Sequence, residues 1–386
     1  MAPTPDLAHF LQRRDLLAYE QRLARSVYAY GVDLRRATQL YNSRIGDPLM
    51  RGVDRRWNAT KQLLDAVLLP TREAPPPIIL EELARLIRLL RAPLPAVRML
   101  RADLDKRWPM ATPLGTTRGG AHWLVLDTER LMDATPAERS YVLGWALGHL
   151  QCDHGPLFAA HLMAGQANRS LGVAGWVLKP WARLATFSAD RAAMIAVGGL
   201  DAALEGLPFT EELDVPWLPA GPSLSVRRRA LEDFAGSSVM ARLRVLTEAG
   251  HPEWTLGSPR PAATGAMAER LSHVFGTAAR FGYSAAWMLS GGTDGRDTRQ
   301  DDKDGSDKES AAKESAAKES SAKESSAKES DSDSADASPK PKTPPPQAQD
   351  PVQQDPELRA RLESALEDAT SVARCDENLT RRLGLL

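Results

Sequence analysis

The chain has 386 residues, 42% of them hydrophobic and 26% charged, with a formal net charge of −1. This length allows one or two domains with a buried core, and the near-neutral balance gives no general attraction to nucleic acid. Two cysteines argue against a disulfide framework and for a reducing compartment, so we expect a cytoplasmic protein. We find neither a signal-peptide pattern nor an apolar run near the roughly 18 residues of a membrane-spanning helix.

Residues 1–74 predict an N-terminal helical region. Leu23, Val27 and Tyr30 follow the helical period, and arginines occupy many of the other positions. A solvated helix face is the simplest explanation of the arginines. The alternative is a basic surface for peripheral contact with membrane headgroups or with an acidic partner. Three prolines at 75–77 then interrupt the chain.

A small sheet is expected at the start of the next domain, which we place at residues 75–290. Residues 78–90 predict an amphipathic helix, because leucine and isoleucine recur on one face. Residues 97–100 and 121–126 predict short strands, and 128–132 a short helix.

The next helix begins with a capping box. Thr135 is the expected N-cap, Pro136 fits the first helical position, and Glu138 stands three residues after the cap. The helix then runs toward His154, and one face is expected to be apolar with a histidine in it, because residues recur there at steps of three and four: Tyr141, Val142, Trp145, His149 and Cys152. A buried helix whose histidine is hydrogen-bonded in the core explains this pattern.

A second interpretation compares the same helix with the H-E-x-x-H pattern of zinc peptidases. There, two histidines one turn apart bind the metal, and the glutamate takes a proton from the metal-bound water. His149 stands at the second histidine position. Trp145 replaces the first histidine, and Ala146 replaces the glutamate.

The stretch 141–154 resembles the HtpX-like zinc metallopeptidases, the gluzincin family that includes the CAAX prenyl endopeptidases. The shared residues are the Gly148-His149 pair, Cys152 and His154. The resemblance covers about residues 75–250 and implies a mainly α fold with a small β-sheet (α+β). In this zincin-like metallopeptidase fold, two core helices cross at the zinc site.

A later helix in that family supplies the third zinc ligand, a glutamate, and a supporting aspartate four residues on. Residues 183–192 keep the aspartate as Asp190 and have Thr186 at the ligand position. The family also has an N-A-Y-T-L-G segment before its active helix, which residues 110–115 resemble. Pro113 removes a backbone N–H from this segment, so any peptide-binding edge is weakened.

The losses at Trp145, Ala146 and Thr186 imply an inactive homologue with no catalytic residue, no bound metal and no cofactor. Such a pseudo-peptidase would act by binding a protein, as an adaptor, regulator or assembly component. The alternative is an active zinc-dependent metalloendopeptidase with a rearranged site, for which Asp153 and His154 are the shifted candidates.

Further helices are expected after the central one. Residues 156–179 predict a helical hairpin over the former cleft, 184–197 a second core helix, and 262–284 a last domain helix. Asp190 is expected to be a capping or buried acceptor, paired with an arginine or with His149. The run at 227–229 is expected to be solvated surface.

The composition changes at residue 291. Residues 291–355 predict a low-complexity charged linker, with KESAA-type repeats that favour a partly helical spacer and then a Pro-rich disordered part. Residues 356–386 predict a C-terminal amphipathic helix or docking tail, with one apolar face from Leu358 to Ala373. The tail is closed by Leu379, Leu383, Leu385 and Leu386. A protein partner would bind through this tail or the vestigial cleft. Docking on the chain's own domain stays open, as does a scaffold whose only active part is the tail.

Overall fold

The computed structural model describes residues 18–65, 67–70, 74–101, 108–116, 122–166, 172–210, 221–257 and 350–385. These ranges belong to one compact unit, Met1–Pro259 together with Gln349–Leu386, while Arg260–Ala348 form a second unit. The helix expected at 262–284 and the KESAA-type repeats lie outside the described residues. The expected fold class is confirmed at the coarse level, because the structure is mainly helical with one small mixed sheet.

The N-terminal helices are α2 (Ala18–Tyr28), α3 (Gly31–Asn42) and α4 (Gly46–Asp65). Tyr28 and Tyr30 are fully buried at the turn between α2 and α3, whereas Arg35 and Arg36 are exposed. The helical prediction for this region is therefore confirmed over the described residues. The helices belong to the same core as the residues that follow, since Tyr28 and Leu64 pack in one cluster with the central helix.

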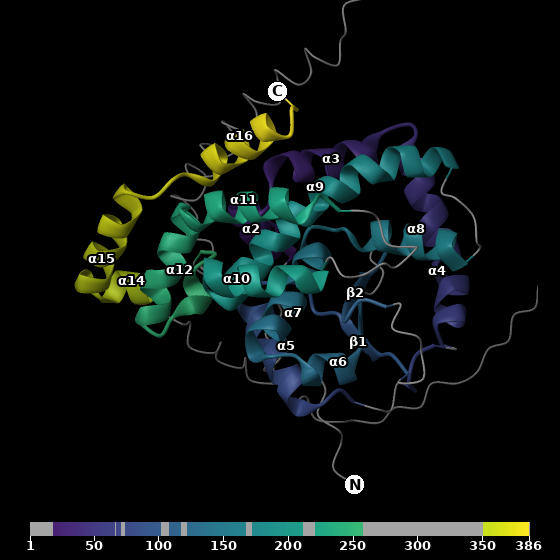
Figure 1. The fold of residues 1–386 in the computed structure, drawn as a ribbon, viewed down its shortest axis with the longest axis horizontal. Coiled ribbons are helices and arrows are strands. Elements are labelled where there is room, and N and C mark those ends of the chain that lie inside the picture. The colour runs from purple at the N-terminus through teal and green to yellow at the C-terminus, as the bar shows by residue number, and fades with distance from the viewer. Residues whose placement is uncertain are drawn as a thin grey trace, which may run out of the picture. The chain divides into compact units, whose positions relative to one another are not determined.

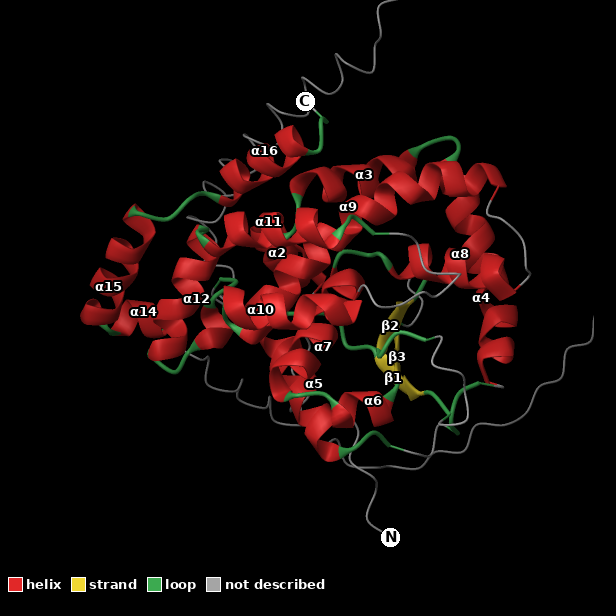
Figure 2. Ribbon diagram, viewed as in Figure 1, coloured by secondary structure: helices red, strands yellow, loops and turns green. Residues whose placement is uncertain are grey.

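The sheet has three short strands in the order β1-β3-β2. β1 (Ala96–Met99) runs parallel to β3 (Trp123–Leu126), and β2 (Ala111–Leu114) runs antiparallel to β3. Helix α5 (Pro77–Leu90) precedes the sheet, and Figure 2 shows the strands as a small group surrounded by helices. The segment that resembles the family's N-A-Y-T-L-G is thus an edge strand.

Helix α6 (Thr128–Asp133) leads into α7 (Pro136–Gln151), the central helix. The capping box is confirmed: the Thr135 hydroxyl accepts from the Glu138 amide, and the Glu138 carboxylate accepts from the Thr135 amide at 2.8 Å. The prediction of one apolar face is wrong, however. Every residue from Tyr141 to Gln151 is buried, because α5, β2 and two helices that follow in the chain, α9 and α10, all pack against α7.

Helices α8 (Gly155–Gln166) and α9 (Gly172–Val197) follow α7. The start of the second core helix was predicted at residue 184, but α9 begins twelve residues earlier and continues through Pro180. It packs closely along α7: a Cβ added at Gly148 would lie 2.5 Å from the Cβ of Ala192. Glycine therefore allows the two helix backbones to approach each other.

Four elements complete the body of the unit: α10 (Leu200–Gly206), the 3₁₀ helix η1 (Leu207–Thr210), α11 (Leu224–Ala235) and α12 (Ser238–Glu248). A further 3₁₀ turn, η2 (Pro252–Trp254), lies near α5. No helix within the described ranges is both long and apolar enough to cross a membrane.

The C-terminal region forms three helices, α14 (Pro351–Gln354), α15 (Pro356–Glu367) and α16 (Val372–Arg382), drawn in yellow in Figure 1. The sequence predicted one continuous apolar face from 358 to 373. That prediction is wrong, because the chain breaks between α15 and α16, where Thr370 forms a parallel bridge with Ser237. Disorder up to residue 354 was also expected, yet α14 is helical and capped by Asp350.

Candidate functional site

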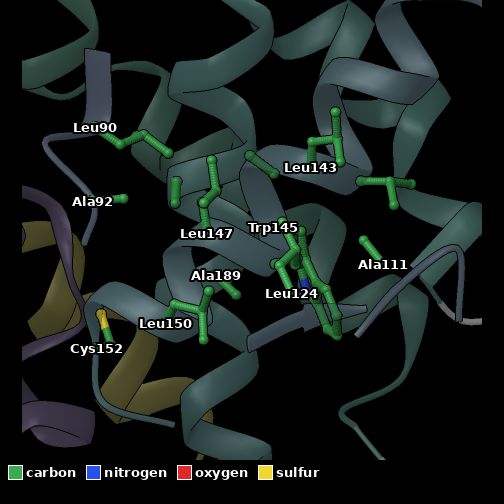
Figure 3. Close-up of a cluster of buried hydrophobic side chains, with 14 of the residues drawn as sticks. Leu90, Ala92, Ala111, Leu124, Leu143, Trp145, Leu147, Leu150, Cys152 and Ala189 are labelled. Carbon is green, nitrogen blue, oxygen red and sulfur yellow. The ribbon is translucent and has the colours of Figure 1, made fainter. Parts of the chain in front are cut away.

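Trp145 occupies the position of the first zinc-ligating histidine and is buried in the core. Its side chain is 4% exposed and belongs to the same hydrophobic cluster as Ala111 of β2 and Leu124 of β3, as Figure 3 shows. Its ring meets the imidazole of His149 edge to face, with centroids 4.2 Å apart, and the ring of Phe158 at 6.0 Å. An indole therefore fills the space next to the retained histidine.

His149 is held by a second histidine rather than by a carboxylate. Its Nδ1 lies 2.9 Å from Nδ1 of His154, and its ring also packs against Phe158 at 4.8 Å. Burial lowers the pKa of His149 well below its ordinary value, with the neighbouring His154 and Arg227 acting in the same direction. The ring is therefore neutral at physiological pH.

The second of these histidines, His154, is hydrogen-bonded to a fully buried carboxylate, that of Asp33 in α3. Oδ1 of Asp33 lies 3.1 Å from Nε2 of His154 and accepts from the Trp181 indole N–H at 3.0 Å. Its other oxygen accepts from the hydroxyl of Ser188 at 2.5 Å. The carboxylate thus has three side-chain partners, as a charge without solvent contact requires.

This chain of bonds sets the tautomers when both rings are neutral. Since Asp33 can only accept, Nε2 of His154 carries the proton, and Nδ1 of His154 must accept from Nδ1–H of His149. The remaining nitrogen of His149, Nε2, then bears a lone pair. It is buried and has no hydrogen-bond partner among the described residues, and the same holds for the indole N–H of Trp145.

Asp190 pairs with an arginine and not with His149. Nε and an Nη of Arg227 donate to its two carboxylate oxygens at 2.8 and 2.5 Å, and the Tyr141 hydroxyl donates at 3.3 Å. Both charged side chains are almost fully buried. The prediction of a solvated surface is therefore wrong for Arg227, whereas Arg228 and Arg229 are exposed.

The other two positions of the family pattern carry no suitable chemistry. Thr186 is buried and its hydroxyl donates to the carbonyl of Ala182 in its own helix at 3.1 Å. Ala146 is fully buried and has no proton-transferring group. Neither residue replaces the lost glutamates.

Asp153, one of the shifted candidates, is not on the same helix face as His149. The α-helix ends at Gln151, and Asp153 has a positive φ of 61° beyond the C-cap. Its half-exposed carboxylate is paired with Arg25 of α2. The other candidate, His154, does contact His149, so the structure brings together one of the two shifted candidates.

These residues do not fit a zinc ion. A structural or catalytic zinc site needs at least three protein ligands from histidine, cysteine or carboxylate side chains. Across the described part of the chain, no group of three or more such residues is placed to hold a metal ion. His149 alone offers an unbonded lone pair beside the ring of Trp145.

The edge strand β2 lacks one backbone donor. The amide of Asp127 donates to the carbonyl of Met110, which fixes the hydrogen-bonding pattern of the ladder. The backbone N–H and C=O groups of Thr112 and Leu114 therefore point toward β3, and the backbone of Pro113 points to the outer edge. Proline has no N–H to offer there. The backbone of Leu114 is also approached by Gly155 at the start of α8, where an added Cβ would lie 3.1 Å away.

The C-terminal residues predicted to bind a partner are placed differently from one another. Leu379 is 1% exposed and packs on the chain's own Tyr30, Phe187 and Ala230, with Leu383 partly buried beside it. Leu385 is 52% exposed, and Leu386 lies outside the described residues. The tail therefore docks on its own domain through Leu379.

Sequence reasoning missed three charged residues that hold the structure together: Asp33, Arg191 and Asp376. Arg191 is 2% exposed and donates to Asp376 of α16 at 2.7 Å. Position 191 directly follows Asp190 in the part of α9 where the neighbouring residues, 184–190 and 192–197, are mostly small or apolar, and a second charge there was a signal available in the sequence. A local sequence pattern cannot indicate hydrogen bonds between distant residues. Ser188 and Asp33 are 155 positions apart, and Arg191 and Asp376 are 185 positions apart.

Comparisons with family models, curated proteins and solved structures found no match to this chain.

Proposed function

We propose that this chain is a catalytically inactive, peptidase-like protein that acts by binding another protein, as an adaptor or assembly component in the cytoplasm. The observation that supports this most directly is the buried ring of Trp145 against His149. A hydrolytic zinc site keeps an open coordination position for water and substrate. Here an indole occupies the neighbourhood of the only retained ligand position on α7.

The surroundings of Asp190 support the same proposal. In the family that the sequence resembles, the corresponding aspartate supports the zinc site, but here both of its oxygens are bonded to Arg227. The pair joins α9 to α11 within the core. Asp190 has thereby become part of the packing between helices.

One observation favours the alternative of a zinc-dependent endopeptidase with a rearranged site. Nε2 of His149 carries a lone pair, and the contact with His154 and Asp33 fixes it, much as outer-shell partners orient metal-ligating histidines. This nitrogen could bind a metal only if two further ligands came from elsewhere.

The metal content of the full chain distinguishes the two functions. The protein is purified with zinc present, and bound zinc is measured for the wild type, for His149→Ala, and for His251→Ala as a half-exposed control. We expect zinc far below one equivalent in all three, and no chelator-sensitive cleavage of casein. Stoichiometric zinc that is lost only in His149→Ala would refute the inactive assignment.

A restored variant makes the test sharper. Trp145→His, Ala146→Glu and Thr186→Glu together return the three lost groups to the family pattern. Zinc binding by this variant but not by the wild type would show that the frame is intact and that these three replacements account for the loss. Zinc binding by neither would remove the resemblance as support for the proposal.

A further inference from the structure

The surface that holds α16 is built to receive a carboxylate. Asp376 accepts from the guanidinium of Arg191 at 2.7 Å and from the backbone N–H of Gly31 at 2.9 Å. Gly31 is the first residue of α3, whose N-cap Tyr30 provides no side-chain cap. The carboxylate therefore caps α3 from a distant segment, at the positive end of the helix dipole.

A hydrophobic contact lies one helical turn further along α16. Leu379 is buried against Tyr30, Phe187 and Ala230, and the next residue, Thr380, shares a hydrogen bond of 2.8 Å with the Tyr30 hydroxyl. Residues 376, 379 and 380 are neighbours on one helix face. The surface thus contacts three side chains of α16: an aspartate, a leucine three residues later, and the hydroxyl residue that follows the leucine.

Arg191 is a costly residue to leave without a partner. It also donates to the Tyr28 carbonyl at 3.1 Å, and its guanidinium lies over the rings of Tyr30 and Phe234. These contacts fix its position but do not neutralise its charge. A surface with a held cation, an N-terminal helix amide and an apolar contact is therefore selective for a helical segment that carries a carboxylate at the position of Asp376.

The buried part of α16 is small, although an ion pair between Arg382 and Asp233 at the surface adds to its contacts. Only Cys375, Leu379 and Thr380 of this 11-residue helix are buried, and an isolated helix of this length is marginal in water. The segment is retained because it belongs to the same chain, which makes its binding intramolecular. A stronger helix with the same three features can therefore replace it.

We infer that this surface is a receptor for a helix of a partner protein with the pattern Asp-x-x-Leu-Thr, and that α16 is the resident competitor which that partner displaces. The inference rests on the proposed function, because it names the chemistry of the bound protein. It does not involve Trp145 or His149, so either proposal can fail without the other.

The test uses a fluorescent peptide of residues 371–386 and the full-length chain. In the opened chain, Asp376→Ala and Leu379→Ala weaken the resident α16 and leave the receptor residues intact. We expect the opened chain to bind the peptide roughly ten-fold or more tightly than the wild type, because the closed state reduces apparent affinity in proportion to its population. Peptides with either of the same two replacements should lose this binding.

Gly31→Ala in the opened chain provides a matched pair with Gly52→Ala. An added Cβ at Gly31 would lie 2.9 Å from the bound carboxylate oxygen, whereas a Cβ at Gly52 meets no described atom within 4 Å. Peptide binding should fall only in Gly31→Ala. Equal binding by wild type and opened chain, or equal binding of all peptides, would overturn the inference.

A cleavable chain covers the case in which the opened variant does not fold. A protease site is inserted between residues 300 and 310, and the wild-type sequence is kept elsewhere. After cleavage, we expect the labelled peptide to exchange with the resident C-terminal fragment, and absence of exchange would overturn the inference. Self-association of the opened chain without added peptide would identify a second copy as the occupant, against the partner-protein assignment.

Discussion

The guanidinium of Arg227 and the carboxylate of Asp190 form a doubly hydrogen-bonded ion pair inside the protein, with N–O distances of 2.8 and 2.5 Å. Arg227 also donates to the Thr210 hydroxyl at 2.6 Å, and Tyr141 donates to Asp190. The pair therefore connects α9, α11 and η1 with the central helix α7.

Replacement of Arg227 by methionine should destabilise the protein strongly. The change leaves the Asp190 carboxylate buried without its counter-charge, and breaking a buried pair in this way costs about 3–5 kcal/mol. Urea unfolding of the full chain measures the loss. Arg228→Met, at an exposed neighbouring position, is the control and should change stability by no more than about 0.5 kcal/mol.

The double variant Asp190→Leu with Arg227→Met tests the reason for that loss. Because it removes both charges, it should recover a large part of the stability lost in Arg227→Met alone. If the double variant is less stable than the single one, the contribution of the pair is not electrostatic.

Gly148→Ala should weaken the contact between α7 and α9. The added methyl group would lie 2.5 Å from the Cβ of Ala192, and neighbouring contacts at Gly144 are equally close. Overpacking of this kind costs about 1–3 kcal/mol. Gly52→Ala in α4 has open space around the new methyl group and should be neutral or stabilising, which a comparison of the two melting temperatures checks.

Stability should fall as the pH falls below neutrality. Burial, aided by Lys179, lowers the pKa of His161 to about 4, and burial lowers the pKa of His149 as well. The unfolded chain titrates its histidines near pH ~6.5 and so binds more protons below that value. The contribution of each histidine is complete above pH ~6.5 and is lost as the pH falls toward the folded pKa, at up to about 1.4 kcal/mol per pH unit.

His161→Gln isolates one part of this pH dependence. Urea unfolding between pH 7.5 and 4.5 should show a shallower decline than in the wild type, by up to one proton's contribution. His251→Gln, at a half-exposed position, serves as the control. An unchanged slope in His161→Gln would mean that this histidine takes up a proton in the folded protein.

Thr135→Ala should cost about 1 kcal/mol, because it removes one half of the capping box of α7. Thr38→Ala, at an exposed site inside α3 where the hydroxyl donates only to the Leu34 carbonyl of its own helix, is the comparison and should be neutral or slightly stabilising. If both variants have the same melting temperature, the cap does not contribute to stability, and the burial of α7 alone determines where the helix begins.

Local signals predicted much of the fold. The α7 capping box, the α5 apolar face and the two strands at 97–100 and 121–126 depend on residues close together in sequence, and all appear in the structure. The beginning of α9 was missed because Pro180 usually ends a helix, whereas here tertiary packing maintains the helix through it.

The candidate site was harder to predict, because its pairings are between distant residues. Arg227 looks like its neighbours Arg228 and Arg229 in the sequence, and only the fold places it beside Asp190. The motif comparison identified Trp145 and His149 correctly as neighbours one turn apart. It gave no indication of Asp33, which stands 121 residues before His154 and orients that histidine.

The capping of Gly31 by Asp376 has a consequence for the order of folding. The two residues are 345 positions apart, whereas the helices of the body form from contacts within a few residues. Contacts between such distant positions are slow to form compared with local ones. The α3 terminus and Arg191 should therefore reach their native arrangement after the core around α7 and α9, as a separate late phase in refolding kinetics.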